Sequence, residues 1–380
     1  MKSFPRRLVQ FLPVLLILVA MATAQDAEPE RGADTTAGFA RIDITPQIPV
    51  RMVGYASRGY EGQPAEGKLF ARAVAIGDAK GELGALMITA DLLGIPRSLR
   101  DRVLAGLEAE LGISAEKFAI SATHTHGGPS LSGYMQETHF SQILPEGERA
   151  RIDEYTDRLV ASLIQIGVEA SKSREPAILR WGEGRAGFAM NRRIIENGKW
   201  VGMRPNQGGS VDHSLPVLTA TSPGEDGKVL GVFLSYACHC TSYSPPKDSF
   251  HGDWAGAAAA TIEARHPGSV ALVAAGCGAD ANPHPRIADA APFIEKHGEE
   301  IADEVDGLLS DETRTFQMTA LPTCRIQTVQ LPFATKPDRE EFEAWATGSE
   351  KRRAFYGQLW LDRLDRGLTV PEHIDYLVQS

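Results

Sequence analysis

The sequence has few cysteines and no basic tract. Its 380 residues contain four cysteines, at positions 238, 240, 277 and 324, too few for the disulfide framework of a small secreted domain. The sequence leaves their pairing open, and one or two bridges would be compatible with it. No segment rich in Lys and Arg occurs, and the formal net charge is −10. Nucleic acid is therefore not an expected partner.

A long hydrophobic run near the N-terminus is interrupted. Residues 8–20 are mostly apolar, but Gln10 and Pro13 break the run, and it is shorter than the ~20 residues of a membrane-spanning helix. Basic residues precede it, and the small residues "ATA" stand before Gln25. This order favours a signal peptide over residues 1–24 rather than a membrane anchor, and predicts a secreted or periplasmic protein.

The remaining chain alternates between strand-like and helix-like segments. Residues 25–36 are polar and predict a flexible linker. From residue 37 on, short apolar runs alternate with amphipathic segments, in a chain that is 43% hydrophobic. The pattern predicts strands at 117–121, 229–237 and 269–276, and helices at 98–112, 151–171 and 254–266. We therefore expect an α/β domain over 37–380, with a mixed, largely parallel sheet flanked by helices.

Polar clusters follow three of the predicted strands. His124 and His126 come after the first, His239 after the second, and Asp280 and Asn282 after the third. In open α/β sheets, ligands bind beyond the carboxyl ends of the strands. The sequence thus predicts that these distant segments share one pocket, with the active site at the C-terminal ends of the strands.

The residue types in these clusters are typical of a metal site. His124 and His126 are two residues apart, so an extended backbone would turn both imidazoles to the same side. Neutral imidazole is a preferred zinc ligand, and His239 would be a natural further donor. Asp253 and Asp280 would then orient the imidazoles by accepting their second N–H group.

Simpler interpretations exist for each of these residues. The two neighbouring histidines fit a polar loop, and His239 fits a hydrogen-bonded core histidine. Asp253 fits a helix cap, and Asp280 fits a turn. Because Cys238 and Cys240 flank His239, a thiolate-containing site or a disulfide is also open, although their side chains should face away from that of His239 in a strand.

Several blocks of the sequence resemble one enzyme family. The segment "SATHTHGGP" is similar to the signature of neutral, non-lysosomal ceramidases, which are zinc-dependent amidases that cleave N-acylsphingosines. The resemblance covers roughly residues 37–380, and its further blocks occur in the family's order: "MVGYASR", "MNRR", "VDHSLPVL", "YACHCTSYS", "FHGDWAG" and "GADANPHPR".

The resemblance implies a role for each matching residue. His124 and His239 match zinc ligands of the family, and His126 matches a pocket histidine placed for proton transfer or substrate contact. Arg192, in "MNRR", matches an active-site arginine that would hold a substrate oxygen or stabilise developing negative charge. Without the resemblance, a structural ion pair would be the simpler interpretation of Arg192.

Two departures from the family pattern affect the expected chemistry. Where ceramidases carry a serine in a Gly-Asp-x-Ser-Pro-type segment, this chain has Asn282. An amide is no nucleophile of that kind, so we expect attack by zinc-activated water, with Asn282 as an oxyanion donor or water-positioning group; Cys277 is the alternative nucleophile. The family also completes its zinc shell with a glutamate and a tyrosine from a later segment, so we expect the C-terminal part of the catalytic domain to be missing after the strand at 373–380.

Three functions are compatible with the sequence. The first is a secreted zinc-dependent amidohydrolase that hydrolyses ceramide or a related small-molecule N-acyl lipid and reaches it by peripheral contact with a membrane. The second is a catalytically impaired relative that binds a lipid or a metal. The third is a metal hydrolase of a different ester or amide, since no residues identify a groove for a sphingoid chain.

Overall fold

The computed structural model describes residues 34–55, 58, 61–62, 68–134, 142–224, 227–242, 249–286 and 291–380. The predicted signal peptide, residues 1–24, lies outside them. The predicted linker over 25–36 is too long at its C-terminal end, because strand β1 begins at Thr35. The Thr35 hydroxyl is buried and donates a hydrogen bond to the carbonyl of Ala177, which ties this part of the chain into the sheet.

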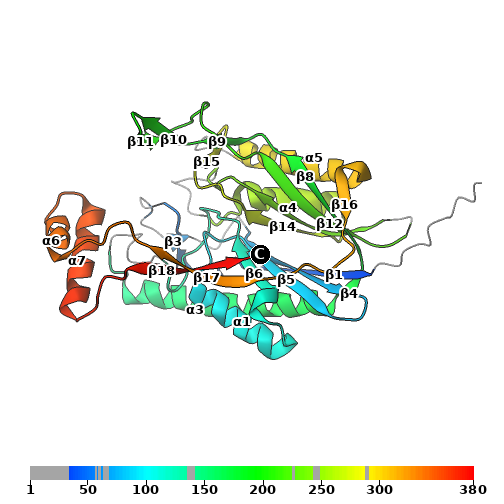
Figure 1. Cartoon of the computed structure of the whole chain (residues 1–380), viewed down its shortest axis with the longest axis horizontal. Helices are drawn as coiled ribbons and strands as arrows, with labels where there is room; N and C mark the ends of the chain where they lie inside the picture. The colour runs from blue at the N-terminus through cyan, green and yellow to red at the C-terminus, as the bar shows by residue number, and fades with distance from the viewer. Residues whose placement is uncertain are drawn as a thin grey trace, which may run out of the picture. The chain divides into compact units, whose positions relative to one another are not determined.

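Two five-stranded sheets form the centre of the described part of the chain (Figure 1). The first sheet has the order β6-β5-β4-β1-β7, and the second has the order β14-β13-β12-β8-β16. The strands of the first sheet are β1 (Thr35–Asp43), β4 (Phe70–Asp78), β5 (Leu83–Ala90), β6 (Phe118–Ala122) and β7 (Glu175–Pro176). The strands of the second are β8 (Ile178–Arg185), β12 (Ser214–Thr221), β13 (Val229–Tyr236), β14 (Val270–Ala275) and β16 (Thr315–Gln317).

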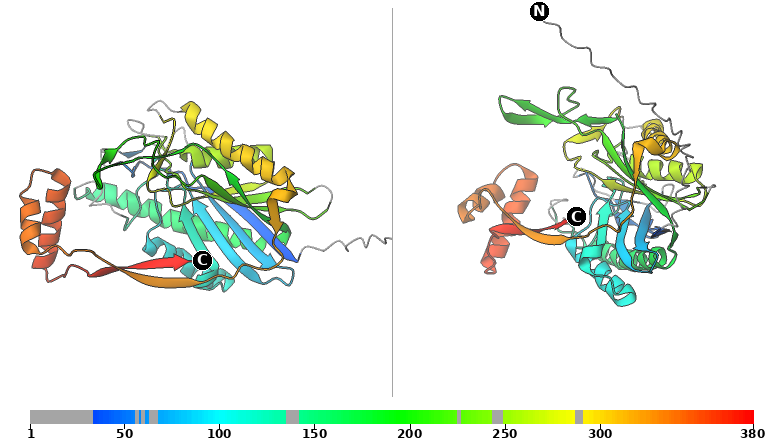
Figure 2. Two further views of the ribbon diagram at one scale, coloured as in Figure 1. Left: turned by 45° about the horizontal axis from the view of Figure 1, so that its top comes forward. Right: turned by 45° about the vertical axis from the view of Figure 1, so that its right-hand side comes forward.

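Helices cover the outer face of each sheet, so that four layers are stacked (Figures 1 and 2). Helices α1 (Arg97–Leu111) and α3 (Glu146–Lys172) pack on the first sheet, and α4 (Asp253–Arg265) and α5 (Ala291–Ser310) pack on the second. Apolar side chains fill each helix–sheet interface, and a third apolar cluster lies between the two sheets. Because both faces of the central strands are buried, strands such as β4 are apolar almost throughout, with the sequence "FARAVAIGD".

The structure confirms a mixed α/β fold with helices on the sheets, but the expectation of a largely parallel sheet is wrong. The parallel pairs in the two large sheets are β5–β6 and β13–β14, whereas the other pairs are antiparallel. The connections between the strands explain part of the difference. Helices α1 and α4 link the two parallel pairs, while short connections join β4 to β5 and β12 to β13, which makes these two pairs antiparallel.

The parallel strands place the polar clusters. Strands β6, β13 and β14 end at the same edge of the stacked sheets, and the loop after β6 forms an isolated parallel bridge, Thr125 to Cys240, with the segment after β13. The predicted convergence at carboxyl ends of strands is confirmed for these three strands.

Smaller elements complete the described chain. A two-stranded sheet joins β9 (Ala189–Asn191) to β15 (Ala281–Pro283), and another joins β2 (Val50–Arg51) to β3 (Glu61–Gly62). A hairpin is formed by β10 (Arg193–Glu196) and β11 (Lys199–Met203). Towards the C-terminus, β17 (Ile326–Pro332) pairs with β18 (His373–Gln379), with α6 (Arg339–Ala346) and α7 (Lys351–Asp365) between them.

The predicted strand at 373–380 is therefore present as β18. No helix within the described residues is both long and apolar enough to cross a lipid bilayer.

Candidate metal centre

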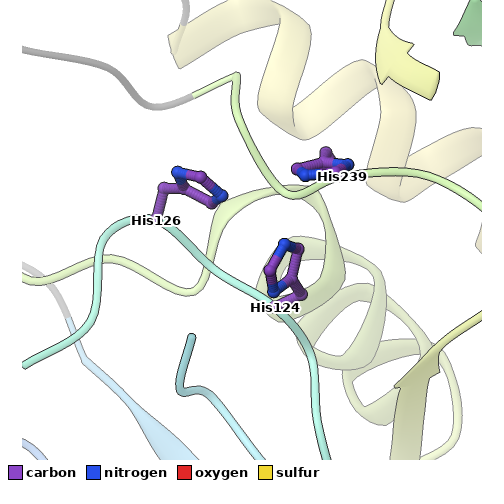
Figure 3. Close-up of side chains that lie close together, drawn as sticks. All are labelled: His124, His126 and His239. Carbon is purple, nitrogen blue, oxygen red and sulfur yellow. The ribbon is translucent and has the colours of Figure 1, made fainter. Parts of the chain in front are cut away.

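Three histidines converge where the strands end. His124 and His126 extend from the loop after β6, and His239 extends from the segment after β13 (Figure 3). The ring centroids of His124 and His239 are 4.6 Å apart, and those of His124 and His126 are 5.1 Å apart. Potential ligand atoms of all three lie within 4.8 Å of one another. Residues more than 100 positions apart thus share one centre, as the strand-end pattern predicts.

Hydrogen bonds to backbone carbonyls hold the histidine loop in place. The Thr125 hydroxyl donates to the carbonyl of His251, and the His126 N–H donates to the carbonyl of Cys240. His124 has a φ of 62°, in the left-handed region that costs a non-glycine residue about 1–3 kcal/mol. With this backbone conformation, the His124 ring packs edge-on against that of His239. Gly127 is required here, because a Cβ atom would lie 2.4 Å from the carbonyl oxygen of His251.

Two of the imidazoles have a defined tautomer. Nδ1 of His124 lies 2.7 Å from the carbonyl oxygen of Leu93, and Nδ1 of His239 lies 2.7 Å from that of Gly278. A carbonyl only accepts, so each Nδ1 carries the proton and each Nε2 has a lone pair that can accept a hydrogen bond or bind a metal ion. This is the arrangement found in metal-ligating histidines.

The prediction that Asp253 and Asp280 accept these N–H groups is wrong, because backbone carbonyls do so. Asp253 is the first residue of α4, and its carboxylate accepts from the N–H of Trp254. The Asp280 carboxylate accepts from the amide of Asn191, and the Asp280 carbonyl accepts from the N–H of Arg192. Asp280 therefore braces the segment that carries Arg192.

Burial keeps the three imidazoles neutral. It lowers the pKa of His239 to about 4, and repulsion by the Arg192 guanidinium adds to the shift. Burial also lowers the pKa of His124, and it lowers that of His126 well below its usual range. Neutral imidazoles keep the lone pairs that a metal ion requires.

His126 differs from the other two histidines. Neither of its ring nitrogens has a hydrogen-bond partner among the described residues, although both are buried. The backbone of Gly54, with a φ of 106°, passes so close that a Cβ atom there would lie 2.8 Å from the His126 ring. The Tyr55 ring packs edge-on against His126 at 4.9 Å between centroids. The His126 ring is thus fixed by packing, and its nitrogens are uncommitted.

Arg192 and Asn282 lie beside the histidines. The two strands that carry them, β9 and β15, pair in antiparallel register with Asn282 opposite Met190. Nη1 of Arg192 donates to Oδ1 of Asn282 over 3.1 Å, and the Thr241 hydroxyl donates to the same oxygen over 3.1 Å. With Oδ1 engaged by two donors, the Nδ2 group of Asn282 is the part of the amide that can donate to another molecule.

These residues line a pocket of about 650 Å³ that opens to solvent. His126, His239, Arg192 and Asn282 lie in its wall, as the sequence predicts for a shared site. The wall also includes residues that the sequence did not single out: Tyr55, Thr241, Met203, Arg204, His284 and Arg286. Among them, four lie in blocks that resemble the family and so offered a signal: Tyr55 in "MVGYASR", Thr241 in "YACHCTSYS", and His284 and Arg286 in "GADANPHPR". Nη2 of Arg286 lies 3.5 Å from the Tyr55 hydroxyl.

The cysteines do not contribute to this centre. All four are free thiols. Cys238 packs in the apolar cluster under α4, and Sγ of Cys240 contacts the carbonyl of Thr123. Burial raises the pKa of both thiols well above the usual range, which disfavours a thiolate ligand. The alternatives of a thiolate site and of a disulfide at Cys238 and Cys240 are therefore not supported.

The chain is similar to known ceramidases. The family model described as "Neutral/alkaline non-lysosomal ceramidase, N-terminal" matches residues 36–295. Neutral ceramidases of Drosophila melanogaster and Drosophila pseudoobscura pseudoobscura are each 27% identical to the chain over 259 residues, which are 63% of this chain and 34% of the relative. The chain thus matches about a third of the length of these curated relatives.

Solved structures show the same fold. Neutral ceramidase from Pseudomonas aeruginosa has a TM-score of 0.62 and 21% identity, covering 82% of this chain and 50% of that one. A ceramidase complexed with C2 has a TM-score of 0.63 and 20% identity, covering 82% and 48%.

Proposed function

Because this chain belongs to the neutral/alkaline non-lysosomal ceramidase family, we propose that it is a zinc-dependent hydrolase of the amide bond in N-acylsphingosine or a related N-acyl lipid. The observation that carries the proposal is the convergence of His124, His126 and His239 at the pocket that Arg192 lines. An export signal at 1–24 would direct the protein to a secreted or periplasmic location.

The residues present fit a zinc ion. His124 and His239 donate their Nδ1 protons to carbonyls, so their Nε2 lone pairs would be the zinc ligands. At His239 the metal bond would replace the hydrogen bond from Arg192. Both are neutral at physiological pH because burial lowers their pKa values. When bound, zinc polarises the amide carbonyl and lowers the pKa of water to about 7.

His126 is suited to move a proton. Its nitrogens have no hydrogen-bond partner among the described residues, so one can accept a proton while the other is protonated. Its ring lies 5.6 Å from that of His239, between centroids. We assign it the transfer of a proton from the attacking water to the leaving amine.

Arg192 and Asn282 would bind oxygen. The guanidinium is half-buried in the pocket wall, and the Asn282 amide has a free N–H group because its oxygen is engaged. Donors that are fixed before reaction stabilise the charge that develops on the carbonyl oxygen. The Thr241 hydroxyl is committed to Asn282 as a donor, so it positions that amide.

A catalytically impaired relative is the second candidate. Asn282 at the position of the family's serine favours it, because the amide provides no nucleophile. Under this alternative the pocket would bind a metal or a lipid without cleaving it. A hydrolase of another ester or amide would use the same groups.

One experiment separates these functions. The metal-loaded protein is incubated with a short-chain N-acylsphingosine, a simple ester and a short amide, and the released acid is measured. We expect acid from the N-acylsphingosine, and none with His239→Asn, which keeps a side-chain donor for the Gly278 carbonyl. Zinc binding without turnover of any substrate would favour the impaired relative, and turnover of the ester alone would favour the third function.

A further inference from the structure

An apolar hairpin projects next to the pocket. Strands β10 and β11 are joined by Asn197 and Gly198, both with positive φ (51° and 73°), as a two-residue type I′ turn requires. The hairpin extends outward beyond the neighbouring sheet (Figures 1 and 2). A tight turn of this kind gives the projecting hairpin one defined conformation.

Large apolar side chains of this hairpin are exposed. The exposed fractions are 56% for Ile195, 57% for Trp200, 48% for Val201 and 63% for Met203. Ile195 lies opposite Trp200, and Arg193 lies opposite Met203. Cross-strand partners share a face, and so do residues two apart in one strand, so Ile195, Trp200 and Met203 form one apolar face. Contiguous exposed apolar surface indicates an interaction site.

The hairpin is continuous with the pocket. Arg192 directly precedes β10, and the N–H of Arg204, which follows β11, donates to the carbonyl of Arg192 over 3.0 Å. Met203 and Arg204 are themselves part of the pocket wall. A binding partner that covers the apolar face would therefore also lie at the entrance of the pocket.

The charges on the hairpin have the sign that an anionic surface attracts. Arg193, Lys199 and Arg204 are cationic, and Glu196 is the one carboxylate of residues 193–204. Glu196 pairs with Arg204 at 3.6 Å, which leaves Arg193 and Lys199 as the excess. The whole protein has a formal net charge of −10, so the local positive charge of the hairpin is opposite in sign to the net charge of the protein.

We propose that the β10–β11 hairpin is a membrane-docking element, which inserts Trp200 and Ile195 into the headgroup region of an anionic lipid bilayer. Tryptophan is favoured at that depth, where its ring is apolar and its N–H stays hydrated. Lys199 and Arg193 contact the lipid phosphates. The pocket mouth then faces the lipid surface, and the proposal rests on the proposed function for the claim that an N-acyl lipid leaves the bilayer there.

Vesicle binding tests this element without any turnover. The protein is sedimented with phosphatidylcholine vesicles, with and without phosphatidylglycerol, none of them containing an amide substrate. We expect binding to the anionic vesicles, weakened by salt. The double variant Trp200→Ser/Ile195→Ser should bind at least about tenfold more weakly, because it loses two large apolar side chains. Phe316→Ser is the matched control, since Phe316 is 72% exposed on β16 and does not line the pocket.

Two results of the vesicle-binding experiment would overturn the proposal. Equal binding by the double variant and by the Phe316→Ser control would overturn the proposal. So would failure of the wild-type protein to bind anionic vesicles, which would indicate a protein contact at this face. A fold check by circular dichroism accompanies each variant.

A second readout separates this inference from the proposed function. The double variant should hydrolyse a soluble short-chain amide at the wild-type rate and lose turnover of vesicle-embedded amide. Vesicle binding that depends on Trp200, without hydrolysis of any substrate, would support the membrane-docking element and contradict the proposed function.

Discussion

Nη2 of Arg192 lies 3.0 Å from Nε2 of His239. Because Nδ1 of His239 donates to Gly278, this Nε2 accepts from the guanidinium. The same lone pair would be used by a metal ligand bond. The guanidinium and a metal ion therefore compete for His239, both through this lone pair and through their like charges.

Replacing Arg192 should separate metal binding from turnover. In Arg192→Met the competing donor and the positive charge are gone, so zinc affinity should equal or exceed that of the wild type. Turnover should fall about 10²–10³-fold, as expected for loss of an oxyanion donor. Zinc titration and initial rates measure both. Weaker zinc binding together with wild-type turnover would contradict the roles given to Arg192.

Variants of Asn282 test whether its amide N–H group acts on substrate. Asn282→Asp keeps an oxygen that accepts from Arg192 and Thr241 but removes the N–H donor. We expect it to be as slow as Asn282→Ala, about 10²–10³-fold below the wild type. Rates on a soluble short-chain amide are the measurement. A wild-type rate in Asn282→Asp would mean that the residue only positions its neighbours.

Acid should destabilise the metal-free protein through His239. The pKa of His239 is lowered from 6.5 to about 4 in the folded protein. Between these two pH values, His239 is protonated in the unfolded chain and neutral in the folded protein. The free energy of unfolding therefore falls as pH drops from 6.5 towards 4, by about 2 kcal/mol from this group at pH 5. Urea unfolding at pH 7 and pH 5 measures the loss.

His239→Asn is the control for this pH dependence. Its side chain does not titrate, so it should lose less stability between the two pH values than the wild type. The same loss in both proteins would show that His239 does not carry the effect.

The sequence predicted the location of the site more accurately than it predicted the pairing of the strands. His124 and His239 follow apolar runs that end in polar residues, and the helices between parallel strands bring such ends together. The antiparallel pairing of β4 with β5 and of β12 with β13 carried no such signal, because it depends on the short connections between those strands.

The sequence could not predict the contacts that backbone atoms make in the site. The carbonyls of Leu93 and Gly278 orient the imidazoles, and any residue type provides a carbonyl. The sequence therefore pointed to Asp253 and Asp280, whose carboxylates are engaged with Trp254 and Asn191. Tyr55 reaches the pocket from a distant loop, and its contact with His126 depends on tertiary packing.

Zinc content of matched histidine variants tests the central claim most directly. Each of His124→Asn and His239→Asn keeps a side-chain donor for its backbone carbonyl and lacks the Nε2 ligand, while His126→Asn serves as the comparison. After equilibrium dialysis against buffered zinc, the wild type and His126→Asn should hold one ion per chain. The other two should lose affinity by at least about 100-fold, the upper end of the cost of losing an orienting partner. Full zinc affinity in His124→Asn or His239→Asn would contradict a metal centre built on these two residues.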